Sequence, residues 1–93
     1  MSMPAVFEPY LNADGRIVRL PARHSRRISL CLELLNLVAW NTEYSEKEIN
    51  EIFCSVVDDF AFVRRTLVDM GYLERDAYGK NYRRIPQAQG FTR

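Results

Sequence analysis

The chain has 93 residues, of which 47% are hydrophobic and 27% are charged. This length and composition predict one globular domain over residues 1–93, long enough for one core and not for two. No apolar run reaches the roughly 18–20 residues that a transmembrane helix needs, and the first residues lack the charged-then-apolar pattern of a secretory leader. We therefore expect a cytoplasmic protein that makes no membrane contact.

The net charge of +1 is unevenly distributed. Residues 1–30 carry five arginines and two carboxylates, residues 31–62 carry seven carboxylates and one lysine, and residues 63–93 carry seven basic and three acidic side chains. This balance excludes a protein that coats nucleic acid by charge alone, because such coating needs a large positive excess. It favours a chain with basic ends and an acidic middle.

Cys31 and Cys54 are the two cysteines, and His24 is the one histidine. Because no Cys-x-x-Cys pair is present, we expect two buried reduced thiols, no metal site and no cofactor. The single histidine excludes most triad and metal-hydrolase arrangements, and the sequence contains no nucleophile–base pair, carboxylate dyad or phosphate-binding loop. The sequence therefore favours a protein that is not an enzyme.

Residues 1–21 predict a loop and a short strand. Pro4, Pro9 and the Asp14-Gly15 turn signal interrupt the first part, and the alternation of residues 16–20 is typical of a strand that ends at a proline. A long first helix is then predicted for residues 22–40. Its polar positions form one narrow stripe, so it is apolar on three sides, and we expect it to be the hub of the core or a surface for a homodimer.

Two shorter helices follow. Ser45 and Glu48 predict a capping box at the start of the second helix. Asp58 or Asp59 is expected to cap the third helix, and Gly71 is a natural left-handed stop at its end. The predicted core positions of the two helices are Ile49, Ile52, Phe53, Val56, Phe60, Val63, Leu67 and Met70.

Residues 72–76 and 81–85 are short β-type runs, and the Gly79 turn between them predicts a hairpin over residues 72–85. Residues 86–93 follow as a tail. Three helices over residues 22–70, a hairpin directly behind them and a short N-terminal strand predict an α+β fold, the winged helix-turn-helix.

The chain also resembles a known bacterial family. The segments that carry the resemblance are ADGRIVRLPARHSRR, YSEKEINEIF and DDFAFVRRTLVDMGYLERDAYGKNYRR. Together they are similar to the domain-of-unknown-function family 2087, and the combination is far more specific than any one segment. The resemblance implies a winged-helix-like bacterial protein associated with helix-turn-helix transcriptional regulators, and it implies no biochemical activity.

The predicted third helix and hairpin lead to a first hypothesis, a DNA-binding protein of bacterial transcription regulation. On a helical wheel Arg65 lies opposite the core side of the third helix and is best placed for a base edge, with Arg64 beside it for a phosphate. Basic side chains of the hairpin and of the start of the first helix would contact further phosphates. The candidate nucleic-acid-binding residues are Arg64, Arg65, Lys80, Arg83, Arg84, Arg23, Arg26 and Arg27.

The alternative hypothesis is a winged-helix module that binds another protein and no DNA. Phe62 is predicted on the exposed face of the third helix, while Glu46 and Glu48 lie at the start of the second helix, where they would repel phosphates. These three side chains are the candidate protein contact, and a homodimer through the first or third helix is a further reading. A purely structural hypothesis is a third alternative: the two arginines of the third helix form ion pairs with nearby carboxylates and bind no partner.

Overall fold

A computed structural model of the chain describes residues 5–78 and 80–86. None of the described helices is long and apolar enough to cross a membrane. The elements in chain order are η1 (Ala5–Tyr10), α1 (His24–Leu34), η2 (Leu35–Leu37), β1 (Glu43–Ser45), α2 (Glu46–Cys54), α3 (Phe60–Asp69), β2 (Leu73–Arg75) and β3 (Asn81–Arg84). Of the expected hairpin turn and tail, Gly79 and residues 87–93 lie outside the described residues.

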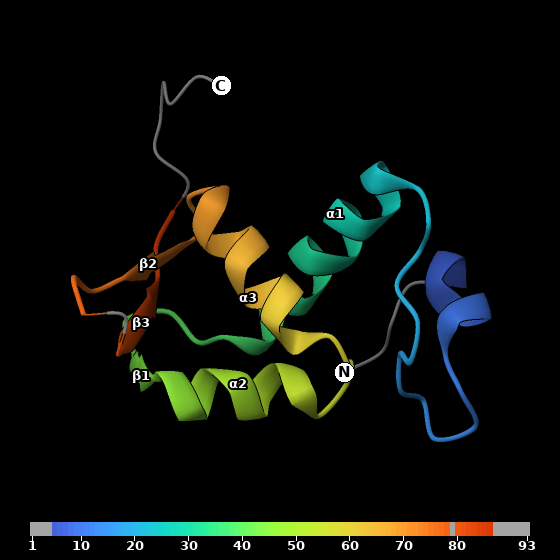
Figure 1. The fold of residues 1–93 in the computed structure, drawn as a ribbon, viewed down its shortest axis with the longest axis horizontal. Coiled ribbons are helices and arrows are strands. Elements are labelled where there is room, and N and C mark those ends of the chain that lie inside the picture. The colour runs from blue at the N-terminus through green and yellow to red at the C-terminus, as the bar shows by residue number, and fades with distance from the viewer. Residues whose placement is uncertain (1–4, 79, 87–93) are drawn as a thin grey trace.

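The strands form one antiparallel sheet in the order β1-β3-β2. Figure 1 shows this sheet on one side of α3 and α1 on the other, with α2 running beneath them. Two helices that meet through a short connection, followed by the β2–β3 hairpin, make the arrangement winged-helix-like. The predicted α+β fold class is therefore confirmed.

Strand β1 is an element that the sequence pattern did not indicate. In the structure Glu43, Tyr44 and Ser45 pair with β3. The strand forms because the hairpin leaves one side of β3 unpaired, so that a short extended segment gains a partner for its backbone groups.

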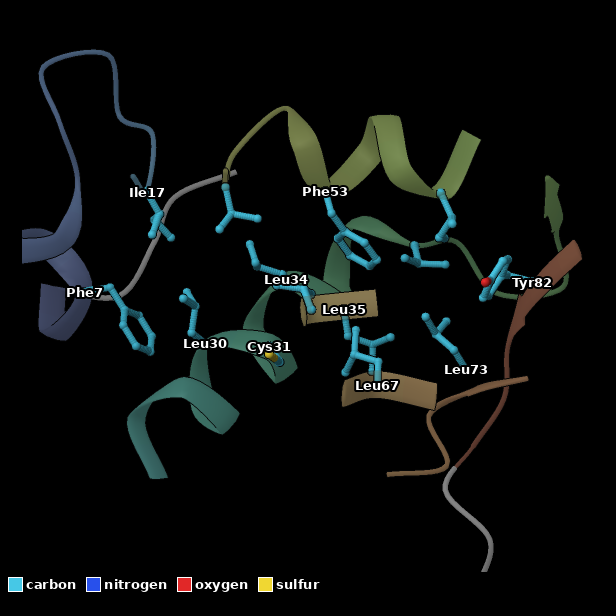
Figure 2. Packing of buried hydrophobic residues seen from close by; sticks show 14 residues of the cluster. Phe7, Ile17, Leu30, Cys31, Leu34, Leu35, Phe53, Leu67, Leu73 and Tyr82 are labelled. Carbon is cyan, nitrogen blue, oxygen red and sulfur yellow. The ribbon is translucent and has the colours of Figure 1, made fainter. Parts of the chain in front are cut away.

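The hydrophobic core is one cluster centred on α1. Leu30, Cys31 and Leu34 of this helix are completely buried. In Figure 2 their side chains lie between Phe7 and Ile17 at one end of the cluster and Leu73 and Tyr82 at the other, although Tyr82 belongs to a strand more than 45 residues later in the chain. The expectation that the first helix is the hub of the core is confirmed.

The first helix is shorter than predicted. The α-helix covers His24–Leu34 and continues only as the 3-10 turn Leu35–Leu37, whereas the apolar pattern predicted a helix to residue 40. The pattern was misleading because two of the last apolar residues have other contacts: Val38 is buried in an extended conformation, and the Trp40 ring lies against the Arg84 guanidinium. Periodicity alone does not separate a buried helix from a buried extended segment.

The predicted N-terminal strand is also wrong in extent. Residues 16–20 contribute isolated bridges at Ile17, which pairs with Leu11 and Val57, and the segment before them contains the unpredicted helix η1. A longer strand does not form because the connection between α2 and α3 offers only a few residues as a partner. Arg16 fixes the segment further: it forms an ion pair with Asp58 (2.7 Å) and donates to the Cys54 carbonyl at the end of α2.

The helix ends follow the predicted signals. Ser45 Oγ accepts a hydrogen bond from the Glu48 amide (3.1 Å), and Glu48 Oε1 accepts one from the Ser45 amide (2.8 Å), which completes the capping box. Of the two candidate caps of α3, Asp59 accepts from the Phe62 amide (3.3 Å). Gly71 has a φ of 83°, as the predicted left-handed stop requires.

Both cysteines are free thiols, but only Cys31 is buried, and Cys54 is half-buried. Cys31 lies in α1 against α3, close to Thr66. Burial raises the pKa of the Cys31 thiol to about 11, because the thiolate would lose its hydration in the core.

The buried thiol predicts a pH dependence of stability. The pKa of Cys31 is higher in the folded chain than the ordinary 9.0, so the stability linked to the neutral thiol is complete below pH 9. It is lost between pH 9 and 11 at about 1.4 kcal/mol per pH unit. Urea unfolding of wild type and Cys31→Ala over this range should show the steeper decline only in wild type. Cys54→Ala, which leaves Cys31 in place, is the matched control and should decline like wild type; equal slopes for wild type and Cys31→Ala would contradict the assignment.

Candidate nucleic-acid interface

A groove of about 210 Å³ runs between α3 and the inner face of the β2–β3 hairpin. We call it the arginine groove, because three of its lining residues are arginines and one is a carboxylate. Residues from three elements, α3, β2 and β3, meet here because α3 packs against β2 immediately after the Gly71 turn. The lining residues are Arg64, Arg65, Val68, Asp69, Arg75 and Tyr82.

Arg64 is held in place on one wall of this groove. Its Nη1 donates to Asn50 Oδ1 of α2 (2.5 Å), and its guanidinium carbon lies 6.0 Å from the centre of the Tyr82 ring. The side chain is half-buried. A guanidinium with five donors still has free N–H groups after one such bond, so Arg64 presents a preoriented charge to the groove.

Tyr82 forms the floor of the arginine groove. Its ring is almost fully buried, and its hydroxyl donates to Glu46 Oε1 (3.1 Å). Burial raises the pKa of Tyr82, and the hydrogen bond to Glu46 raises it further, so the hydroxyl stays protonated. Arg75 lies opposite Tyr82 in the sheet, and its guanidinium opposes part of this rise in the pKa of Tyr82.

Arg75 is a site residue that the sequence reasoning missed. The signal was present, since Arg75 follows the buried Leu73 by two positions, and the alternation of a strand places both on the inner face. Arg75 lines the side of the groove opposite α3 and adds a third guanidinium to those of Arg64 and Arg65.

Arg65 is exposed on α3, as the helical wheel predicted, and forms no hydrogen bond or ion pair with any described residue. Among the described residues, neither arginine of α3 forms the ion pair with a nearby carboxylate that the structural hypothesis expected. Asp58 is instead paired with Arg16, and Asp59 caps α3. Arg65 is therefore a cation available to a ligand.

Lys80 lies where the hairpin returns toward α2. Its carbonyl accepts from the Glu46 amide (2.9 Å), and its amide donates to Asp76 Oδ1 (2.8 Å). This amide is the main reason that the pKa of Asp76 is lowered, and bonds from Asn81 and the Tyr78 amide lower it further. The backbone of Lys80 is thus fixed, while its side chain is exposed.

Two other candidate arginines of the hairpin are occupied by the fold. Arg83 points to the outer face of the sheet, where it lies between Glu43 and Glu74 in register and forms an ion pair with Glu74 (2.8 Å). Arg84 Nη1 donates to the carbonyls of Leu35 (3.2 Å) and Val38 (3.0 Å), and its guanidinium stacks 4.1 Å from the centre of the Trp40 ring. Neither residue lines the arginine groove.

The candidates at the start of the first helix are not brought to the groove. Arg23 precedes α1 and Arg26 lies in its first turn. In Figure 1 this helix lies on the far side of α3 from the sheet. The guanidinium of Arg27 lies 5.7 Å from the centre of the Phe62 ring. These arginines therefore form a second region, separated from the groove by α3.

The residues of the protein-contact hypothesis each have an internal contact. Phe62 is half-buried beneath Arg27, Glu46 accepts from Tyr82, and Glu48 closes the capping box. Glu46 and Glu48 are nevertheless exposed at the start of α2. The structure thus covers much of the ring that was expected to be the apolar centre of that contact.

Two adjoining helices with a β-hairpin directly behind them are the features of a winged-helix-like fold. Within this class, residues 16–84 match the model of the family described as "uncharacterized protein conserved in bacteria" (DUF2087). The chain belongs to this family, as the resemblance of its sequence segments implied. No curated protein and no solved structure matches the chain.

The contrast between Arg84 and Arg65 predicts opposite effects on stability. Arg84→Ala removes two charge-assisted hydrogen bonds and a stacked guanidinium, and should lower the free energy of unfolding by about 2–4 kcal/mol. Arg65→Ala removes no internal contact and should change it by less than about 0.5 kcal/mol. Urea unfolding measures both. An Arg84→Ala protein as stable as wild type would show that the contacts with Leu35 and Val38 contribute nothing.

Proposed function

We propose that this protein binds double-stranded DNA through the arginine groove and acts in transcription regulation in the bacterial cytoplasm. The observation that carries the proposal is the convergence of Arg64, Arg65 and Arg75 on one groove beside the third helix of a winged-helix-like fold. Clustered guanidiniums suit phosphate oxygens, because each offers several N–H donors together with a permanent charge.

The three arginines are suited to different contacts. Arg64 is oriented by its contacts with Asn50 and Tyr82 and offers a fixed charge for a phosphate. Arg75 is exposed and lies opposite Tyr82 in the sheet, where its charge is available to a second phosphate. Arg65 has no internal partner among the described residues and projects from the exposed face of α3, where a recognition helix reaches base edges. Lys80, exposed at the hairpin, supplies a further phosphate contact.

The acidic α2 limits how the duplex approaches. Glu46 and Glu51 line a separate groove between α2 and the start of α3, which is also lined by Asn50, the hydrogen-bond partner of Arg64. Because these carboxylates repel phosphates, the favourable path for a DNA backbone follows the hairpin side of α3. The proposed activity is binding alone, with no catalytic step, metal or cofactor.

Salt dependence is the direct test of this proposal. Wild-type protein should bind a labelled mixed-sequence duplex in low salt, and log Kd should rise linearly with log salt concentration, because bound counterions are released from the duplex. Arg64→Ala and Arg75→Ala should each weaken binding and reduce the slope by about one unit. Fluorescence anisotropy over a salt series measures both quantities.

Arg19→Ala is the matched control. It removes the same charge from an exposed residue of the N-terminal segment, which borders a different groove. Its slope should equal that of wild type. If wild type binds no duplex at low salt, or if Arg19→Ala has the same effect as the two groove variants, the arginine groove is not a DNA site.

A further inference from the structure

Asp69 occupies a position in α3 that the fold does not explain. It is the last residue of the helix, where a carboxylate faces the negative end of the helix dipole. It is exposed, and within the described ranges it forms no hydrogen bond or ion pair. It also lines the arginine groove, where it would repel a phosphate. Asp69 therefore contributes neither to the helix nor to a site that binds phosphates alone.

Asp69 and Arg65 lie one helical turn apart and both line the groove. Their i, i+4 spacing would permit an ion pair, but none is formed. The order along the helix, with the basic residue on the N-terminal side, is the less favourable one for such a pair. The groove thus offers a guanidinium donor and a carboxylate acceptor side by side, each with its hydrogen-bonding capacity unused.

We propose that Arg65 and Asp69 read the sequence of the bound duplex, with Arg65 donating to a guanine and Asp69 accepting from a cytosine. This inference rests on the proposed function. In the major groove, guanine presents the acceptors O6 and N7, which match a guanidinium fork, and cytosine presents the N4 amino donor, which matches a carboxylate. Thymine O4 and guanine O6 are acceptors and would repel Asp69, so the carboxylate selects partly by exclusion.

The helix geometry sets the spacing of the two contacts. Four residues of α-helix advance by about 6 Å, and successive base pairs are about 3.4 Å apart. The guanine and the cytosine read by Arg65 and Asp69 should therefore lie one to two base pairs apart. The phosphate contacts of Arg64 and Arg75 hold the helix in register while these two side chains select the bases.

The test is a selection with the 93-residue chain and a library of duplexes in which the central eight base pairs are randomised. Wild type should enrich duplexes with a guanine and a cytosine at this spacing, and a wrong base at either position should weaken binding roughly five- to hundredfold. Asp69→Asn should move the preference at the cytosine position to adenine, which an amide recognises through N6 and N7. Arg65→Ala should remove the preference at the guanine position alone.

The folded state of each variant is checked by circular dichroism and urea unfolding. Asp69→Asn should be as stable as wild type or slightly more stable, because it removes a charge that opposes the helix dipole. Arg75→Ala is the control for phosphate contacts and should weaken binding to all library members alike.

The outcomes separate this inference from the proposed function. One outcome is duplex binding that depends on salt and is weakened by Arg75→Ala but shows no base preference. It would overturn base recognition by Arg65 and Asp69 and leave the proposal of DNA binding intact. A base preference that Asp69→Asn does not change would overturn the role of Asp69. A wild-type protein that retains no library duplex at low salt would overturn both.

Discussion

The contacts of Tyr82 are the constraint on which the rest of the structure depends. This residue lies in the central strand, between Tyr44 of β1 and Arg75 of β2. Its buried ring closes one end of the core, its hydroxyl is bonded to Glu46 at the start of α2, and Arg64 of α3 lies over its face. One side chain thereby joins the sheet to both helices of the helix-turn-helix, and the arginine groove exists because these elements meet around it.

The fold divides the basic residues into two groups. Arg16, Arg83 and Arg84 are bound to carbonyls or carboxylates of the chain, and Arg16 and Arg84 bind carbonyls at or just beyond helix ends. Arg65 and Lys80 are exposed and available to a ligand. A net charge of +1 is thus compatible with a local basic site, because the carboxylates of the ion pairs and of α2 lie outside the arginine groove.

The sequence predicted correctly those features whose stabilising contacts join residues that are close in the chain. The capping box of α2, the Asp59 cap, the stop at Gly71 and the hairpin all depend on residues within a few positions of one another. The extent of the first helix and the strand β1 could not be predicted in this way. The carbonyls at the end of the helix are bound by Arg84, nearly 50 residues away, and β1 forms because the β2–β3 hairpin alone would leave one edge of β3 unpaired.

The sequence by itself determined the order and type of the main helices and of the hairpin, the central place of the first helix in the core, and the outward position of Arg65. Periodicity and capping specify these features within single segments. Only the tertiary structure decided which arginines are free. It brought Arg75 to the groove, turned Arg83 to the outer face and placed Arg84 against the carbonyls of Leu35 and Val38. The physical reason is that a guanidinium binds whichever carbonyl or carboxylate the packing brings near, and strand register decides which face each side chain occupies.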